Sequence, residues 1–305
     1  MTVNFRSCGQ TRIFPTENLQ TIKDGVWQAA GLHFLTPSKK GSILVIRQFP
    51  TANPVPQHIA VIMDGNRRWA QQRALPVAMG HASGARRVRE LVKACVERGV
   101  KYLSLFAFST ENWKRPEEEV TGLMGLLSLY LQKEVQDMSK QGVRLRVIGD
   151  TSGFSPRIQA LIHDAQANTA QNTVITLSIA VNYGGRWDML QAFKGWQAAN
   201  PGKLAEALSE AALSPYLSTA YAPEPELLIR TGGEARVSNF MLWQLAYTEF
   251  YFTDLLWPDF GKTDLDQAIS SYAQRDRRFG GGAHDKPAQA GDAVKTVKAV
   301  TPRRI

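Results

Sequence analysis

The chain has 305 residues, of which 44% are hydrophobic, and a formal net charge of +9. This length allows one substantial core, so we expect a single folded domain over 55–282, a flexible or non-core extension over 1–54 and a disordered basic tail over 283–305. The ends carry +4 (residues 1–55) and +3 (residues 283–305) of the charge. A basic helix face for nucleic acid is therefore not expected.

Two cysteines exclude a disulfide framework and favour a reducing, cytoplasmic setting. No apolar stretch is long enough to span a bilayer, and residues 1–20 lack the apolar core of a signal peptide. We expect a cytoplasmic protein that is soluble or peripheral at a membrane.

Apolar runs alternate with helical periodicities from residue 56 onward. The predicted strands are 58–63, 102–108, 144–148, 174–181, 226–230 and 249–253. The predicted helices are 80–98, 116–141, 156–170, 186–199, 203–219, 238–247 and 263–278. This alternation predicts an α/β fold, with one domain built on a six-stranded, mainly parallel sheet flanked by helices.

The first predicted strand ends abruptly in a polar sequence, Asp-Gly-Asn-Arg-Arg-Trp at 64–69. Three other strands also end in polar clusters, at 109–115, 182–186 and 230–236. Because the carboxyl ends of parallel strands lie at one edge of a sheet, and ligands collect there, we expect the four clusters to converge.

These clusters combine one carboxylate, Asp64, with several guanidinium groups. Arginine binds phosphate oxygens in a bidentate way, and magnesium is usually held by one or two carboxylates together with substrate phosphates. The chain has no P-loop, no G-x-G-x-x-G after the first strand and no G-x-S-x-G. The sequence therefore predicts a site for diphosphates and a metal. The arginines concerned are Arg67, Arg68, Arg115, Arg230 and Arg236.

The predicted helix 116–141 starts with proline and three glutamates and is followed by Gly142, a usual pattern for helix ends. It carries a long apolar stripe, which is more often core than the wall of a ligand site. The stripe consists of Val120, Leu123, Met124, Leu127, Leu131, Val135 and Met138.

Four blocks of the sequence resemble the cis-prenyltransferases, and among them the bacterial enzymes that make undecaprenyl diphosphate. They are MDGNRRWA at 63–70, FSTENWKRP at 108–116, NYGGRWD at 182–188 and the long block at 229–260. The resemblance covers about 56–282 and implies a magnesium-dependent homodimer with a hydrophobic tunnel. Such an enzyme adds isopentenyl diphosphate in cis to farnesyl diphosphate at the cytoplasmic membrane face. Its product is the precursor of a lipid carrier for cell-wall polysaccharides.

The resemblance also implies roles for single residues. Asp64 matches the carboxylate that holds magnesium and assists departure of the allylic diphosphate, Glu249 a second metal-binding carboxylate, and Asn112 a proton acceptor. Ala107 matches a position near the tunnel mouth and Ile175 a bulky residue at its closed end, with the stripe of 116–141 as a wall. The implied substrate-binding residues are Gly65, Asn66, Arg67, Arg68, Trp69, His81, Ser109, Thr110, Glu111, Trp113, Arg115, Arg230, Arg236, Val237 and Ser238.

Three alternatives remain at this stage. The chain is either a long-chain synthase, a cis-prenyltransferase with a shorter product, or a non-catalytic family member that serves as a binding subunit. The sequence also departs from the family pattern at Val77, where an arginine usually stands four residues before the histidine. That position is either vacant or its role has moved to Arg73.

Overall fold

The computed structural model describes residues 2–7, 10–15, 20–22, 26–29, 32–35, 54–203 and 207–275. The predicted tail over 283–305 lies outside these residues, as do 36–53 of the predicted extension. Within the extension, β1 (Thr2–Ser7) and β2 (Gln10–Pro15) pair antiparallel. A second antiparallel sheet contains β3 (Gln20–Ile22), β4 (Val26–Ala29) and β5 (Leu32–Leu35).

A six-stranded sheet forms the centre of the fold. Its strands are β6 (His58–Ile62), β7 (Tyr102–Ser109), β8 (Val143–Ile148), β9 (Ile175–Tyr183), β10 (Leu227–Arg230) and β11 (Glu249–Phe252). The order is β11-β10-β6-β7-β9-β8, and every neighbouring pair is parallel. All six predicted strands and the α/β class are confirmed, and the sheet is entirely rather than mainly parallel.

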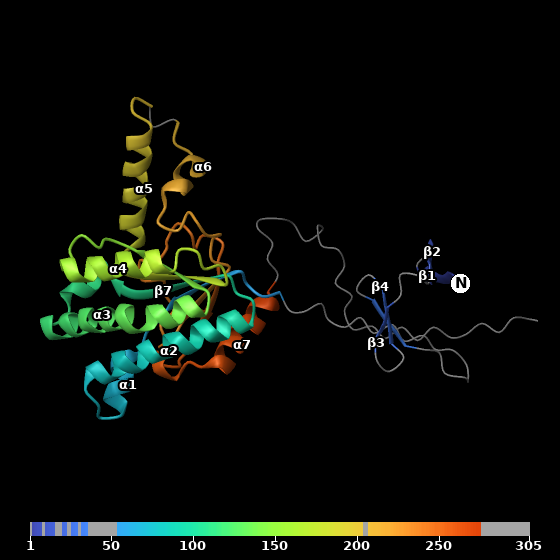
Figure 1. The fold of residues 1–305 in the computed structure, drawn as a ribbon, viewed down its shortest axis with the longest axis horizontal. Helices are drawn as coiled ribbons and strands as arrows, with labels where there is room; N and C mark the ends of the chain where they lie inside the picture. Colours follow the sequence, from blue (N-terminus) through green and yellow to red (C-terminus); the bar gives the residue numbers. More distant parts are fainter. Residues whose placement is uncertain are drawn as a thin grey trace, which may run out of the picture.

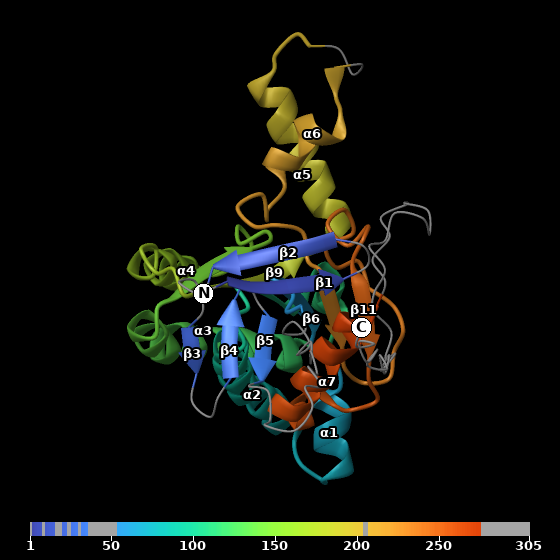
Figure 2. The same cartoon turned by 90° about the vertical axis from the view of Figure 1, so that its right-hand side faces the viewer.

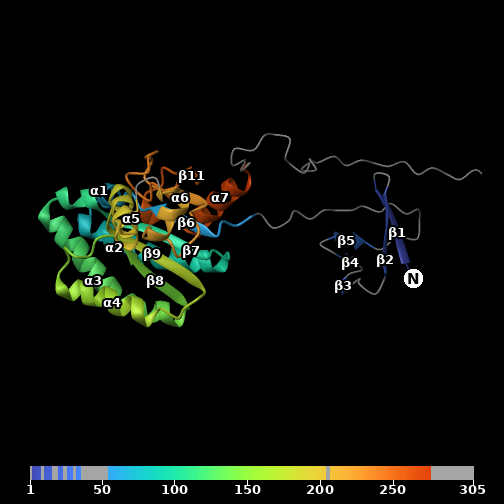
Figure 3. The same cartoon turned by 90° about the horizontal axis from the view of Figure 1, so that it is seen from above.

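The helices follow the strands in sequence, as parallel pairing requires. They are α1 (Asn66–Gln72), α2 (Val77–Glu97), α3 (Glu117–Lys140), α4 (Pro156–Asn168), α5 (Gly185–Ala199), α6 (Glu210–Leu213) and α7 (Lys262–Ala273). Short 3-10 helices occupy Thr110–Lys114, Ser214–Tyr216 and Trp257–Asp259. Helices α3 and α4 lie side by side along the β8 side of the sheet (Figures 1 and 3).

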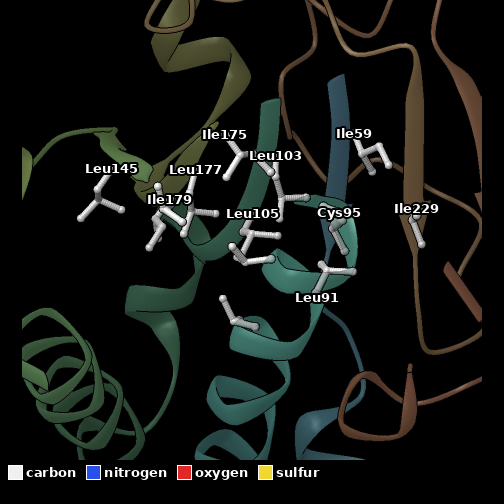
Figure 4. Packing of buried hydrophobic residues seen from close by; sticks show 14 of the residues in the cluster. Ile59, Leu91, Cys95, Leu103, Leu105, Leu145, Ile175, Leu177, Ile179 and Ile229 are labelled. Atoms are coloured by element: carbon white, nitrogen blue, oxygen red, sulfur yellow. The ribbon is translucent and has the colours of Figure 1, made fainter. Parts of the chain in front are cut away.

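One face of the sheet packs against α2, α3, α4 and α7. Figure 4 shows Leu103, Leu105, Leu177 and Ile179 of the central strands beside Leu91 of α2 in one continuous apolar cluster. All of these side chains are buried. At about 25 cal/mol per Å² of buried apolar area, this layer is the main source of folding free energy.

The opposite face of the sheet is covered by the chain between β10 and β11. Phe240 and Met241 pack there on Ala60 of β6 and Ala180 of β9. Helices α5 and α6 instead project from the sheet as an arm (Figures 1 and 2), which has a small cluster of its own around Trp196.

Three elements differ between the prediction and the structure. In the predicted helical region 203–219, the described residues form only α6 (Glu210–Leu213) and the 3-10 helix Ser214–Tyr216, because Pro215 has no amide to continue an α-helix. Helix α1 was not predicted, because its sequence, NRRWAQQ, is short and mostly polar. The predicted helix 238–247 does not form. Ser238, Asn239 and Met241 have positive φ angles, and the Asn239 carbonyl accepts a hydrogen bond from the Gly185 amide (2.6 Å) instead of continuing a helix.

His58, at the start of β6, is buried and neutral. Its Nδ1 donates to the Pro223 carbonyl (2.6 Å), which can only accept, so Nε2 accepts from the Ser104 hydroxyl (2.8 Å). Burial lowers the pKa of His58 to about 4 from 6.5, although the bond to Pro223 opposes this change. Between these pH values the unfolded chain binds a proton that the folded chain does not.

We therefore expect the free energy of unfolding to fall as the pH drops from 6.5 towards 4, by about 3 kcal/mol from this group over the whole window. Urea unfolding across this range measures it. His58→Gln should show a shallower decline, whereas His163→Gln, at a side chain that is 82% exposed, should keep the wild-type slope. Equal slopes for wild type and His58→Gln would contradict the prediction.

Candidate active site

The carboxyl ends of β6, β7, β9 and β10 surround a cleft of about 860 Å³. The four polar clusters therefore converge. Predicted site residues that line the cleft are Asp64, Gly65, Asn66, Arg67, Arg68, His81, Ala107, Ser109, Glu111, Asn112, Arg115, Arg230, Arg236 and Ser238. Arg186 of the predicted cluster 182–186 lines it too, as do Glu119 and Asn239, to which the sequence analysis gave no site role.

Asp64 is fixed by backbone and side-chain contacts at the end of β6. Its amide donates to the Thr231 hydroxyl (3.0 Å), which in turn donates to the Asp64 carbonyl (2.7 Å). The carboxylate accepts from Arg230 Nη2 at Oδ2 (2.9 Å) and lies 3.4 Å from Arg68 Nη2 at Oδ1. Its side chain remains 31% exposed towards the cleft. A fixed carboxylate with an open side suits a metal that also binds substrate oxygens.

Gly65 makes the turn from β6 into α1 possible. Its φ is +106°, and a Cβ atom there would lie 2.8 Å from Leu256 Cδ2. Only glycine avoids both penalties. The turn brings Asn66, Arg67 and Arg68 to the cleft from the first turn of α1.

Glu119 connects three site residues. Its carboxylate lies 3.3 Å from His81 Nε2, 3.1 Å from Arg115 Nη1 and 3.6 Å from Arg67 Nη1, and its side chain is only 11% exposed. Burial lowers the pKa of His81, and Glu119 only partly opposes that effect. The sequence signal was present, because Glu119 follows Arg115 by four residues, but the glutamates were assigned to the helix dipole alone.

The 3-10 segment Thr110–Lys114 is held by side-chain hydrogen bonds. The Ser109 amide donates to Asn112 Oδ1 (3.0 Å), and Glu111 Oε1 accepts from Asn239 Nδ2 (3.0 Å). Burial would raise the pKa of Glu111, but the hydrogen bonds from Asn239, from its own backbone and from Thr110 and Ser109 lower it. Trp113 Nε1 donates to Asn182 Oδ1 (2.8 Å).

On the β10 side of the cleft, buried Arg230 organises the following loop. Its Nη1 donates to the Arg236 carbonyl (2.7 Å) and to the Ser238 hydroxyl (2.7 Å), while Nη2 binds Asp64. Arg236 pairs with Glu234 and is 60% exposed. Arg230 thus fixes the conformation of the loop, whereas the exposed guanidinium of Arg236 is accessible to a bound anion.

Several predicted site residues do not line the cleft. Trp69 Nε1 donates to Asp259 Oδ1 (2.7 Å), and Arg73 stacks on the Trp69 ring (4.3 Å) while it pairs with Asp259 (3.2 Å). Thr110 donates to Glu111 (3.0 Å). Val237 packs on the cluster around Phe240, and Trp113 lines a neighbouring groove.

Glu249 lies far from Asp64 in the same chain. It is the first residue of β11 and is in register with Leu227, which pairs with Ile59. Asp64 lies five residues beyond Ile59, or about 16 Å along the strand direction at about 3.3 Å per residue. The Glu249 carboxylate accepts from Arg275 Nη1 (2.8 Å).

A second, apolar cavity of about 120 Å³ adjoins the cleft. Both share Met63, Asn66, His81, Ala107 and Leu123 as lining residues. Helix α3 also contributes Met124, Leu126, Leu127 and Tyr130, so the N-terminal half of its stripe borders a cavity. Ile175 is buried and does not line this cavity; it lies on the same face of β9 as Ile179 and Val181, which do.

Across residues 54–203 and 207–275, no cluster of three or more histidine, cysteine, aspartate or glutamate side chains could hold a metal ion. A metal at this site would depend on Asp64 and on oxygens of a bound diphosphate, a donor set that suits magnesium. No helix in the described part of the chain is long and apolar enough to cross a bilayer.

Comparisons with known proteins agree with this geometry. The family described as putative undecaprenyl diphosphate synthase matches residues 62–280. An isoprenyl transferase of Ralstonia nicotianae is 55% identical over 231 residues, which cover 76% of this chain and 90% of that protein. A ditrans,polycis-undecaprenyl-diphosphate synthase, (2E,6E)-farnesyl-diphosphate specific, of Pseudomonas aeruginosa is 48% identical over 77% of this chain and 95% of its own length.

Solved structures give the same result. Lavandulyl diphosphate synthase of Lavandula x intermedia, in complex with dimethylallyl diphosphate, superposes with a TM-score of 0.71. It is 37% identical and covers 74% of this chain and 98% of its own. A probable undecaprenyl diphosphate synthase of Campylobacter jejuni has a TM-score of 0.64 and 32% identity, over 75% and 99% of the two chains.

Proposed function

Because this chain belongs to the undecaprenyl diphosphate synthase family, we propose that it adds isopentenyl diphosphate in cis to farnesyl diphosphate and makes undecaprenyl diphosphate. One observation carries the proposal. The cleft that holds Asp64 and the arginines adjoins an apolar cavity through shared lining residues. The polar cleft suits the diphosphate groups, and the adjoining apolar cavity suits an isoprenoid tail. We assign this activity to the domain over 55–282.

In this reaction the bond between C1 of the allylic substrate and its diphosphate oxygen breaks. C4 of isopentenyl diphosphate bonds to C1, and a proton leaves C2. Arg67 and Arg68 bind the departing diphosphate, whereas Arg236 and Ser238 bind that of isopentenyl diphosphate. Asn112 lines the cleft, and we propose that it accepts this proton. The apolar lining keeps water from the electron-poor allylic carbon.

Asp64 would hold a magnesium ion, since it presents a carboxylate to the cleft between two guanidinium groups. When bound, the ion neutralises negative charge that develops on the leaving diphosphate. Glu249 is too distant to share this ion with Asp64 of the same chain. We propose a homodimer, in which Glu249 of a second copy would supply the second metal-binding carboxylate.

The product has a long apolar tail, and we propose that the enzyme works peripherally at the cytoplasmic face of the membrane, where the tail can partition into lipid. Burial of about 0.8 kcal/mol per CH₂ favours this transfer.

The test is incubation of pure protein with magnesium, farnesyl diphosphate and labelled isopentenyl diphosphate, followed by sizing of the products. Long polyprenyl diphosphates support the proposal, and chelation of the metal should stop elongation. A short product would indicate the shorter-chain alternative. Absence of incorporation, with the protein folded, would indicate a binding subunit.

Ile175→Ala should lengthen the products. Ile175 lies on the cavity-facing side of β9, four residues before Ile179, or about 13 Å deeper at about 3.3 Å per residue. Removing most of its side chain opens volume beyond the present cavity without touching the diphosphate residues. Product sizing measures the effect. Leu228→Ala, which removes similar volume on the opposite face of the sheet, is the control, and an unchanged length for Ile175→Ala would contradict the prediction.

Val77→Arg should lower the KM for farnesyl diphosphate. Val77 starts α2, one turn before His81 and on the same helix face, so an arginine there reaches towards the cleft. A charge-assisted contact contributes about 1.5–3 kcal/mol, which corresponds to roughly tenfold or more in KM. Arg73 is engaged by Trp69 and Asp259, and Arg73→Ala should therefore leave this KM unchanged. If Arg73→Ala instead raises the KM for farnesyl diphosphate strongly and Val77→Arg does not lower it, Arg73 has taken over the binding of the allylic diphosphate.

A further inference from the structure

Two asparagines to which the sequence analysis gave no individual role hold the Thr110–Lys114 segment by side-chain hydrogen bonds. Asn182, near the end of β9, accepts from Trp113 Nε1 at Oδ1 (2.8 Å). Its Nδ2 donates to the Asp150 carbonyl (2.8 Å), and its own carbonyl accepts from the Asp150 amide (3.2 Å). Asn182 therefore joins the ends of β8 and β9 to Trp113.

Asn239 makes an equivalent connection from the loop after β10. Its Nδ2 donates to Glu111 Oε1 (3.0 Å), and its Oδ1 accepts from the Arg186 amide (3.0 Å). Its carbonyl accepts from the Gly185 amide (2.6 Å). Asn239 thus joins the loop that carries Arg236 and Ser238, the start of α5 and the 110–114 segment.

Both asparagines have left-handed backbone conformations, with φ of +46° for Asn182 and +61° for Asn239. Such conformations are uncommon outside glycine, and asparagine tolerates them better than most residues. In each case the turned backbone is accompanied by a side chain that binds the same segment. The two residues are called the asparagine clamp below.

Burial alone does not fix the clamped segment. Trp113 is 42% exposed, and no residue of Thr110–Lys114 is buried. Three consecutive side chains are instead fixed by hydrogen bonds: Glu111 to Asn239, Asn112 to the Ser109 amide and Trp113 to Asn182. Trp113 also packs edge-on against Phe108, with 5.1 Å between the ring centroids. Glu111 and Asn112 themselves are held on the cleft wall by polar contacts.

We propose that Asn182 and Asn239 are positioning residues for prenyl transfer, which hold the 110–114 segment so that Asn112 faces the reacting carbons. The proposal rests on the proposed function. Since Asn239 is the neighbour of Ser238, the clamp also sets the distance between the segment and the loop that binds isopentenyl diphosphate. A displacement of about 1 Å at such a position can lower the rate about 100-fold.

Asn182→Gly and Asn239→Gly delete the two side chains and leave the positive φ angles unstrained. Each should lower kcat/KM for isopentenyl diphosphate roughly 10- to 100-fold. Trp113→Phe removes the indole donor that binds Asn182. If Asn182 acts through Trp113, the kcat/KM of the double variant Asn182→Gly/Trp113→Phe should equal that of the less active of the two single variants. Additive losses, or wild-type kinetics for both glycine variants, would overturn the proposal.

A substitution at Gly184 can displace the Asn239 side chain without changing either asparagine of the clamp. A Cβ atom there would lie 2.6 Å from Asn239 Nδ2 and 3.0 Å from Thr110 Oγ1. Gly184→Ala should therefore reproduce the loss of Asn239→Gly. The matched control is Gly153→Ala, where the added carbon meets nothing within 4 Å. Equal kinetics for the two alanine variants would count against the clamp.

Hydrogen exchange of the amides over 110–114, read by mass spectrometry on the full chain without substrate, gives a second readout. Exchange should be faster in both glycine variants and in Gly184→Ala than in wild type and Gly153→Ala. Unchanged exchange would overturn the clamp itself. If wild type shows slow exchange here but elongates no substrate, the proposed function fails, and the positioning role fails with it while the clamp contacts stand.

Discussion

Asp64→Ala is expected to lower kcat by several orders of magnitude while the protein stays folded. The carboxylate is the one acidic group held between Arg68 and Arg230 in the cleft, and its loss removes the proposed metal ligand and the partner of both arginines. Removing one principal electrostatic group commonly costs a factor of about 100 to 1,000 or more in kcat. Steady-state kinetics with product sizing measures the effect.

The backbone contacts of Asp64 with Thr231 do not involve the carboxylate, so the turn should persist in the variant. Asp64→Asn is the matched control for shape: it keeps an oxygen near Arg230 but lacks the charge, and it should also lose most activity. Circular dichroism and the unfolding temperature establish folding. A decrease in kcat of less than about tenfold for Asp64→Ala would refute the assignment.

Asp188→Ala should lower the free energy of unfolding by about 3–5 kcal/mol, because it leaves several buried donors without an acceptor. Asp188 is 1% exposed. Its Oδ2 accepts from the Tyr183 hydroxyl (2.8 Å) and Gln244 Nε2 (3.0 Å). Its Oδ1 accepts from the Ser218 amide (2.9 Å) and hydroxyl (2.6 Å). Burial, and then the Asp188 charge, raise the pKa of Tyr183, which therefore stays a donor.

Chemical denaturation of purified variants tests this prediction. Leu190→Ala, on the same helix but at a residue that is 60% exposed, should change stability by less than about 0.5 kcal/mol. Asp188→Asn should lose an amount of stability between those of Asp188→Ala and Leu190→Ala, since asparagine keeps the shape and one acceptor oxygen. A loss below about 1 kcal/mol for Asp188→Ala would mean that the surrounding donors find other partners.

The central strands could be predicted because each is an apolar run with polar residues directly after it, as buried parallel strands require. Helix α1 and the loop at 238–247 could not. The α1 sequence has no apolar face of its own and depends on the Gly65 turn. The loop sequence has helical periodicity, but the backbone of Asn239 bonds instead to Gly185, a contact between distant segments that local pattern cannot contain.

The same distinction applies to the site. Asp64, Arg68 and Arg230 follow strand ends, so topology alone predicts that they meet. Glu119 and Asn239 belong to the site because their side chains contact residues that are distant in sequence. Glu119 contacts Arg67, and Asn239 contacts Glu111. Sequence spacing encodes only the Arg115–Glu119 pair, and the contacts of Glu119 with Arg67 and of Asn239 with Glu111 appear only in the packed structure.

The sheet order has a consequence for synthesis on the ribosome. Strand β6 is the first of the six to be made, yet its neighbours are β7 and β10, and the pair between Asp64 and Arg230 spans 166 residues. Contacts of such high sequence separation form slowly, because loop closure must precede them. One edge of β6 therefore stays open in the nascent chain until β10 emerges. The emerging polypeptide has no complete diphosphate cleft before that moment, and it exposes a strand edge that a chaperone would be expected to cover.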